Sequence, residues 1–193
     1  MHIELDRVDR ITAGAVGPAG DRTFFIQARQ GVRLVSVLVE KQQVQLLAAS
    51  VLEILSRTGK ETGEGPPDEE LELEEPVMPE WRAGRLAIGY EEEHDLLVLE
   101  AEELVPEVEE GEEEAEEGEE EGERAPADAQ AAEEEHEPGT IRLRATREQM
   151  LSFARHGTEV CAAGRPTCRF CGNPIDPEGH ACPALNGHRS SGE

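Results

Sequence analysis

Aromatic and basic residues are both scarce in this chain of 193 residues. It contains four phenylalanines, one tryptophan and one tyrosine, so few large side chains are available to anchor a core or an interface. Only 18 residues are Lys or Arg, against 44 that are Asp or Glu, and the formal net charge is −26. Such a charge repels polyanions, which disfavours binding of nucleic acid by the chain as a whole.

Long apolar runs are also lacking. Met1 to Arg10 includes five charged side chains, which a secretory signal peptide does not contain, and no later run approaches the length of a membrane span. The protein is therefore expected to be soluble and cytoplasmic, with no membrane partner. Four cysteines, three of them between residues 168 and 182, suit a metal site in a reducing compartment better than a disulfide framework.

Most of the negative charge belongs to one segment. Residues 100–137 hold twenty acidic residues and one basic residue and contribute −19, so the other 155 residues carry only −7. Residues 109–123 comprise eleven Glu, three Gly and one Ala, which leaves no apolar face to bury. We expect residues 102–137 to be a disordered acidic insertion that serves as a solvated spacer. A specific acidic docking segment is the alternative.

Strand and helix patterns fill the first part of the chain. Runs rich in β-branched residues, separated by turn residues, predict strands at Val8–Val16, Thr23–Arg29 and Val32–Val39. From Glu40 to Gly59 apolar residues recur at the spacing of an amphipathic helix. Residues 60–80, rich in Gly, Pro and Glu, are expected to form a linker or a long surface loop.

The same order of patterns returns in the second part. Strands are predicted at Trp81–Tyr90, Leu96–Ala101 and Thr140–Ala145. A second helix begins after Thr146, which forms a capping box with a glutamine three residues later, and ends at Gly164. Both halves thus read strand, strand, strand, helix. This order favours a duplicated βββα unit, and the alternative is that junctions look alike because cap and turn chemistry is limited.

These patterns predict an α+β domain with an antiparallel sheet and two helices, formed by residues 1–101 plus 138–164. Residues 165–193 are predicted to form a zinc-binding C-terminal module. In that module, Cys168 and Cys171 are two residues apart, so both thiolates can point to one centre, and the following glycine permits the tight turn of a zinc knuckle. Three incidental cysteines or a redox pair are the alternatives.

The remaining ligands of the predicted zinc site come from the segment that follows. Cys182 is the third, and the fourth has to be His180 or His188. His180 is preferred because the turn at residues 176–179 can deliver it together with Cys182, whereas His188 lies near a polar C-terminus that is costly to order. Four protein ligands leave no coordination position for water or substrate, so the predicted zinc is structural rather than catalytic.

Other residues with potential chemistry have plainer explanations. Cys161 lies on the apolar face of the second predicted helix and is expected to be a small buried hydrophobe. Four histidines have no partner in the sequence and are expected at the surface: His2, His94, His136 and His156. No catalytic residue and no cofactor-binding loop is identified.

Three functional interpretations follow. The leading one is a non-catalytic binding or adaptor module whose partner is a protein. A nucleic-acid-associated zinc protein is an alternative, because residues 140–193 carry a local charge of +2 with Arg165, Arg169 and Arg189 near the zinc site, although no aromatic stacking platform is visible. The third is an enzyme whose site is not recognisable from sequence.

Several short segments at both ends of the chain form a joint pattern: Arg10–Gly14, Thr23–Arg29, Glu40–Gln43, Gly164–Pro166, Cys168–Gly172, Asp176–Pro177, Gly179–His180 and Asn186–Gly187. They resemble the bacterial family catalogued as domain of unknown function 3090, and the resemblance covers nearly the whole chain outside the acidic tract. It implies a Cys-x-x-Cys and Gly-His-x-Cys tail, which supports His180 as a ligand, and it implies no activity. The Glu-rich insertion departs from the family pattern.

Overall fold

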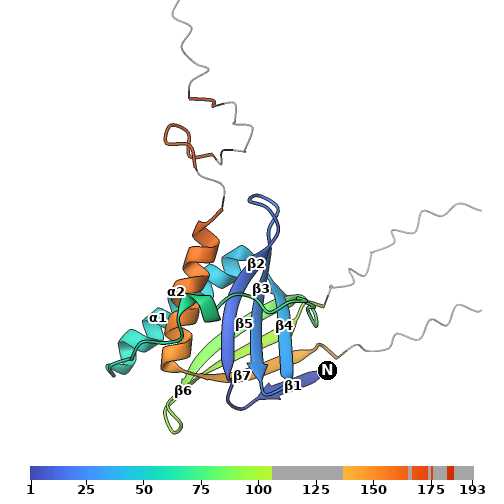
Figure 1. The fold of residues 1–193 in the computed structure, drawn as a ribbon, viewed down its shortest axis with the longest axis vertical. Helices are drawn as coiled ribbons and strands as arrows, with labels where there is room; N and C mark the ends of the chain where they lie inside the picture. The colour runs from blue at the N-terminus through green and yellow to red at the C-terminus, as the bar shows by residue number, and fades with distance from the viewer. Residues whose placement is uncertain (106–136, 165–166, 174, 176–181, 185–193) are drawn as a thin grey trace, which may run out of the picture.

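The computed structural model describes residues 1–105, 137–164, 167–173, 175 and 182–184 (Figure 1). These residues form the predicted α+β fold, and the 3-10 helix η1 (Asp68–Glu70) is its one short helix. The longer elements are β1 (His2–Leu5), β2 (Arg10–Val16), β3 (Thr23–Gln30), β4 (Arg33–Val39), α1 (Lys41–Thr58), β5 (Ala83–Glu91), β6 (Leu96–Glu103), β7 (Thr140–Thr146) and α2 (Arg147–Ala162). The four-residue β1 is absent from the predicted strands because so short a run has no readable period.

The strands form two antiparallel meanders. In the first, β3 lies between β2 and β4, and Ile26 pairs with Ala13 on one side and with Val37 on the other. In the second, β6 lies between β5 and β7. β1 extends the second sheet by pairing with β7, and this pair is parallel. The described part of the chain therefore forms two sheets, of three and four strands.

The two sheets meet at two corners. The N–H groups of Val8 and Asp9 donate to carbonyls of β7 and β3, at 2.9 and 2.8 Å, as the chain passes from one sheet to the other. At the other corner a single bridge joins Leu38 of β4 to Arg82, just before β5. Strands of the two sheets cross in the view of Figure 1, and both helices lie on one side of them.

Each meander is followed by a helix, so the βββα order occurs twice along the chain. The helices are exchanged between the halves: α1, from the first half, contacts β5, and α2, from the second half, contacts β2. The two helices also contact each other. Each half thus depends on the other to cover the first strand of its meander.

One continuous hydrophobic cluster joins the inner faces of both sheets to the helices. Alternate strand residues such as Ile11 and Leu99 point into it, as expected for strands with one buried face. Phe153 of α2 is fully buried in the cluster. Close approach of α2 is possible because Gly157 has no side chain: a Cβ there would lie 3.2 Å from Val44.

Both helices begin where their local chemistry predicts, and α1 also ends there, whereas α2 ends at Ala162, two residues before the predicted Gly164. At the start of α2, the Gln149 N–H donates to the Thr146 hydroxyl at 3.2 Å, and the Gln149 side chain accepts from the Thr146 N–H at 2.9 Å. These two bonds are the predicted capping box. Helix α1 begins with the equivalent arrangement at Glu40 and ends at Gly59, whose φ of 63° is left-handed.

Residues 64–77 form a covering segment over the outer face of the β2–β3–β4 sheet, where a linker or loop was expected from composition. Leu71 of this segment is fully buried and its carbonyl accepts from the Thr12 hydroxyl. The Gln27 side chain pairs with the backbone of Glu74, donating to its carbonyl at 3.1 Å and accepting from its N–H at 2.8 Å. In Figure 1 the covering segment crosses in front of the three strands.

The two ends of the acidic insertion are held together. β6 runs to Glu103, two residues past its predicted end, and the Glu103 N–H donates to the Gly139 carbonyl at 2.8 Å. The Gly139 N–H in turn donates to the Glu103 carboxylate at 2.8 Å. Residues 106–136, which make up most of the predicted disordered insertion, lie outside the described residues.

Candidate metal centre

Three of the four predicted zinc ligands come together in the structure. The sulfur atoms of Cys168, Cys171 and Cys182 all lie within 4.8 Å of one another, and the Cys168 and Cys182 sulfurs are 3.8 Å apart. Cys168 and Cys182 are buried and Cys171 is half-buried. His180 and His188, the candidates for the fourth ligand, lie outside the described residues.

A tight turn of the backbone positions the first two cysteines. The Gly172 N–H donates to the Cys168 carbonyl at 2.8 Å, and the Cys168 N–H donates to the Asn173 carbonyl at 2.7 Å. Gly172 has a left-handed φ of 73°, which glycine adopts at little cost. This is the turn that the glycine after Cys-x-x-Cys predicts.

The backbone of the turn also acts on the ionisation of the thiols. Hydrogen bonds from the N–H groups of Phe170 and Cys171 lower the pKa of the Cys168 thiol to about 7. The pKa of Cys171 is raised instead: the Asn173 N–H lowers it, but loss of solvation and the neighbouring sulfurs of Cys182 and Cys168 outweigh that bond. Ionisation of one thiol opposes ionisation of the next, and a divalent cation would relieve this repulsion.

The cluster has the chemistry of a metal site. Three thiols that converge from two segments of chain can bind a metal ion, and thiolates are the ligands that zinc accepts in structural sites. A redox pair is a poorer fit, because a third sulfur lies beside the two of the Cys-x-x-Cys motif.

A second group of metal-ligating residues was not anticipated from the sequence. His156 and Glu159 are one turn apart on α2, and Asp68 of η1 approaches them, so their ligand atoms lie within 4.8 Å of one another. The sequence contains no signal for this grouping, because Asp68 is distant in the chain. Asp68 and Glu159 are exposed, and exposed carboxylates often approach one another without a metal.

The other residues considered from the sequence have structural roles. Cys161 is buried, and burial raises the pKa of its thiol, as expected for a small core residue. Of the three arginines proposed for nucleic acid, Arg169 lies 4.7 Å from the centre of the Phe170 ring, while Arg165 and Arg189 lie outside the described residues. A membrane-spanning helix would have to be longer or more apolar than α1, α2 or any other helix among the described residues.

Comparison with known proteins agrees with the resemblance seen in the sequence. No curated protein and no solved structure matches the chain significantly. One family model, described as "Protein of unknown function (DUF3090)", matches residues 3–182. This range contains both meanders, both helices and the three clustered cysteines. The chain therefore belongs to the DUF3090 family.

Proposed function

We propose that this protein is a zinc-containing, non-catalytic binding or adaptor module of the cytoplasm with a protein partner. The observation that carries the proposal is the convergence of the Cys168, Cys171 and Cys182 sulfurs within 4.8 Å. With His180 as fourth ligand the zinc has four protein ligands, which is the coordination of structural rather than catalytic sites. Its task is to hold the C-terminal module in shape beside the α+β domain.

The metal content of the purified protein tests this proposal. Elemental analysis should find one zinc per chain, because the four ligands hold a single ion. His180→Ala should lower the zinc content far more than His188→Ala, which serves as the matched histidine control. The opposite ranking would assign the fourth position to His188, and protein without bound metal would refute the zinc site altogether.

A nucleic-acid-associated function is a second candidate, and one contact favours it. The Arg169 guanidinium stacks on the exposed ring of Phe170 at 4.7 Å, which gives the knuckle one flat, cationic surface. Nucleic-acid-binding zinc modules use such surfaces to hold unstacked bases and phosphates. The net charge of −26 opposes the same function.

Salt dependence separates the two candidates. If Arg169 contacts a phosphate, binding of a single-stranded oligonucleotide should weaken steeply with salt, and Arg169→Ala should reduce that slope by about one unit. The measurement should also be made on protein in which residues 106–136 are replaced by a Gly/Ser linker. Absence of binding at low salt in both proteins would eliminate the nucleic-acid candidate.

A further inference from the structure

The outer edge of β5 is open. β5 is the last strand of its sheet, and the bridge to β4 stops at Arg82. The Gln43 side chain covers the start of the edge by donating to the carbonyls of Ala83 and Gly84, at 3.2 and 3.3 Å. From there to Glu91, none of the described residues hydrogen-bonds to the outer backbone of the strand. An edge strand displays the N–H and C=O groups of every second residue, ready to pair with another strand.

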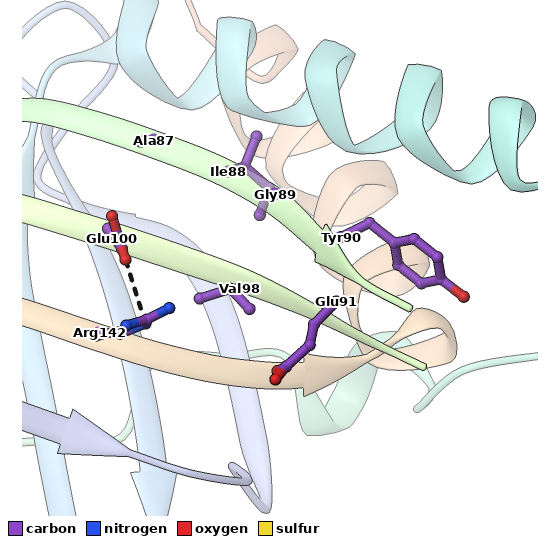
Figure 2. Close-up of a pocket in the computed structure, with 8 residues that line it drawn as sticks. All are labelled: Ala87, Ile88, Gly89, Tyr90, Glu91, Val98, Glu100 and Arg142. Carbon is purple, nitrogen blue, oxygen red and sulfur yellow. Dashed lines mark ion pairs between the residues drawn. The ribbon is translucent and has the colours of Figure 1, made fainter. Parts of the chain in front are cut away.

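Helix α1 runs along this edge and makes a groove with it. Two cavities, of about 340 and 680 Å³, lie between the helix and the strand, and they adjoin at Ile88, which lines both. On the helix side the groove is lined by residues about one turn apart, among them Leu46, Ser50 and Ile54. Ile88 and Tyr90 lie on the face of β5 toward α1, whereas Glu91 points to the other face (Figure 2).

The second face of β5 is also uncovered, which leaves room around the edge. Figure 2 shows a hollow there, with Val98 and the Glu100–Arg142 ion pair, at 3.2 Å, on the neighbouring strands. A Cβ placed on Gly89 would meet no atom within 4 Å. The backbone of another polypeptide can therefore approach β5 at Gly89 without displacing any of the described side chains.

The other half of the molecule shows that the groove is not a requirement of the fold. β2 is the edge strand that corresponds to β5, and α2 packs on it as α1 packs beside β5. There the helix comes close, because Gly157 faces Ala13 and a Cβ on it would lie 3.5 Å from the Ala13 Cβ. Ala13 is fully buried as a result, while Ile88 is only half-buried. The space between helix and edge strand is therefore closed at α2 and β2 and open at α1 and β5.

The charge of the groove differs from that of the chain. Its lining includes three cations, Arg57, Lys60 and Arg85, and one carboxylate, Glu92, in a protein of net charge −26. Lys60 is already bonded to Tyr90 and Asp95. Arg57 and Arg85 stand at opposite ends of the groove, and each already has one acidic neighbour, Glu53 at 4.0 Å and Glu102 at 3.4 Å. Their side chains are 78% and 72% exposed, so the remaining N–H groups of both guanidinium groups are accessible to a ligand.

We propose that β5 and α1 form a docking groove for an extended segment of a partner protein, which adds to β5 as a further strand. The proposal rests on the binding function proposed above and names the class of partner. Alternate apolar side chains of the segment enter between α1 and β5, and acidic residues near its two ends meet Arg57 and Arg85. The open edge from Arg85 to Glu91 is seven residues long, so it accepts a segment of about seven residues at the same rise per residue.

Synthetic peptides titrated into the full-length protein test the groove. The probe is a labelled peptide of about ten residues, a Val/Thr-alternating core with Glu pairs at both ends, compared with the same core flanked by Lys and with a version carrying Pro in the core. The Glu-flanked peptide should bind best and should protect the amides of β5 from hydrogen exchange. Proline in the core should abolish binding, because it removes strand hydrogen bonds.

Two exposed leucines on α1 provide the matched variants. Leu46 lines the groove and is 61% exposed, whereas Leu52 lies outside the lining and is 42% exposed. Leu46→Glu should weaken the Glu-flanked peptide by at least about tenfold, and Leu52→Glu should leave it unchanged. The double variant Arg57→Glu, Arg85→Glu should reverse the preference in favour of the Lys-flanked peptide.

Three outcomes would overturn the inference. The first is no peptide binding at concentrations up to about 1 mM, and the second is an equal loss of peptide affinity in the two leucine variants. The third is self-association of the protein that Leu46→Glu abolishes, which would assign the groove to a second copy of this chain. The proposed binding function is separable from these results. If the zinc content is intact and a partner protein binds equally well to the wild type and to Leu46→Glu, the groove is not the docking site, and the proposed binding function is unaffected.

Discussion

Removing the proposed zinc by chelation should unfold the segment from Thr167 to Ala184 and leave the α+β domain folded. Among the described residues after Ala163, only Cys168 and Cys182 are buried, so the segment has little apolar core of its own. Structural zinc supplies about 10 to 16 kcal/mol of apparent binding energy in finger peptides, which exceeds anything this packing can contribute. Chelation should therefore make the three thiols reactive toward a disulfide reagent, while the fluorescence of the buried Trp81 stays unchanged.

Two cysteine variants control this experiment. Cys182→Ser should lose the metal, whereas Cys161→Ser should retain it, because Cys161 lies on α2 within the hydrophobic core. Loss of metal from both variants would show that the cluster is not the binding site. A change in Trp81 emission on chelation would show that the proposed zinc module and the α+β domain do not fold independently.

Phe153→Ala should cost more stability than any substitution on the surface of the α+β domain. The ring is fully buried in the cluster that joins both sheets to the helices, so its removal leaves a cavity as well as the loss of transfer energy. Such truncations cost about 3 to 5 kcal/mol. For a domain of this size the thermal midpoint should fall by roughly 6 to 20 °C.

Leu151→Ala is the matched control for that substitution. Leu151 lies on the same helix but is only half-buried, so the space left by its side chain is open to solvent. In a denaturant titration, Leu151→Ala should lower the free energy of unfolding by less than half as much as Phe153→Ala does. Equal decreases in the free energy of unfolding would show that Phe153 does not lie at the centre of the hydrophobic core.

Features encoded by neighbouring residues were predictable from the sequence. Thr146 and Gln149 lie three residues apart, and a capping box needs nothing further along the chain. The spacing of Cys168 and Cys171 similarly implies two sulfurs at one centre before any fold is known. The α+β class, the two helices and six of the strands followed from local patterns: apolar periodicity, β-branched runs, and turn and cap residues.

Features that depend on distant residues were not predictable in this way. β1 pairs with β7 across most of the chain, with His2 opposite Thr140, and no local pattern encodes such a pair. The Gly, Pro and Glu content of residues 60–80 predicted a linker or a long surface loop, and it gave no sign that Leu71 of the covering segment is buried or that Gln27 completes the hydrogen bonds of this segment. A buried glutamine inside a strand is a signal for such a partner, because a buried amide needs one.

The hydrogen bonds between Glu103 and Gly139 make the stability of the folded domain nearly independent of the length and charge of the acidic insertion. They fix the distance between the two ends of the acidic insertion, at the mouth of the β6–β7 connection. Because the entropy of closing a loop grows only with the logarithm of its length, doubling the insertion costs about 0.6 kcal/mol. Glutamates can therefore be gained or lost at this position at almost constant stability. The net charge of the protein can then change during evolution while its free energy of unfolding stays nearly the same.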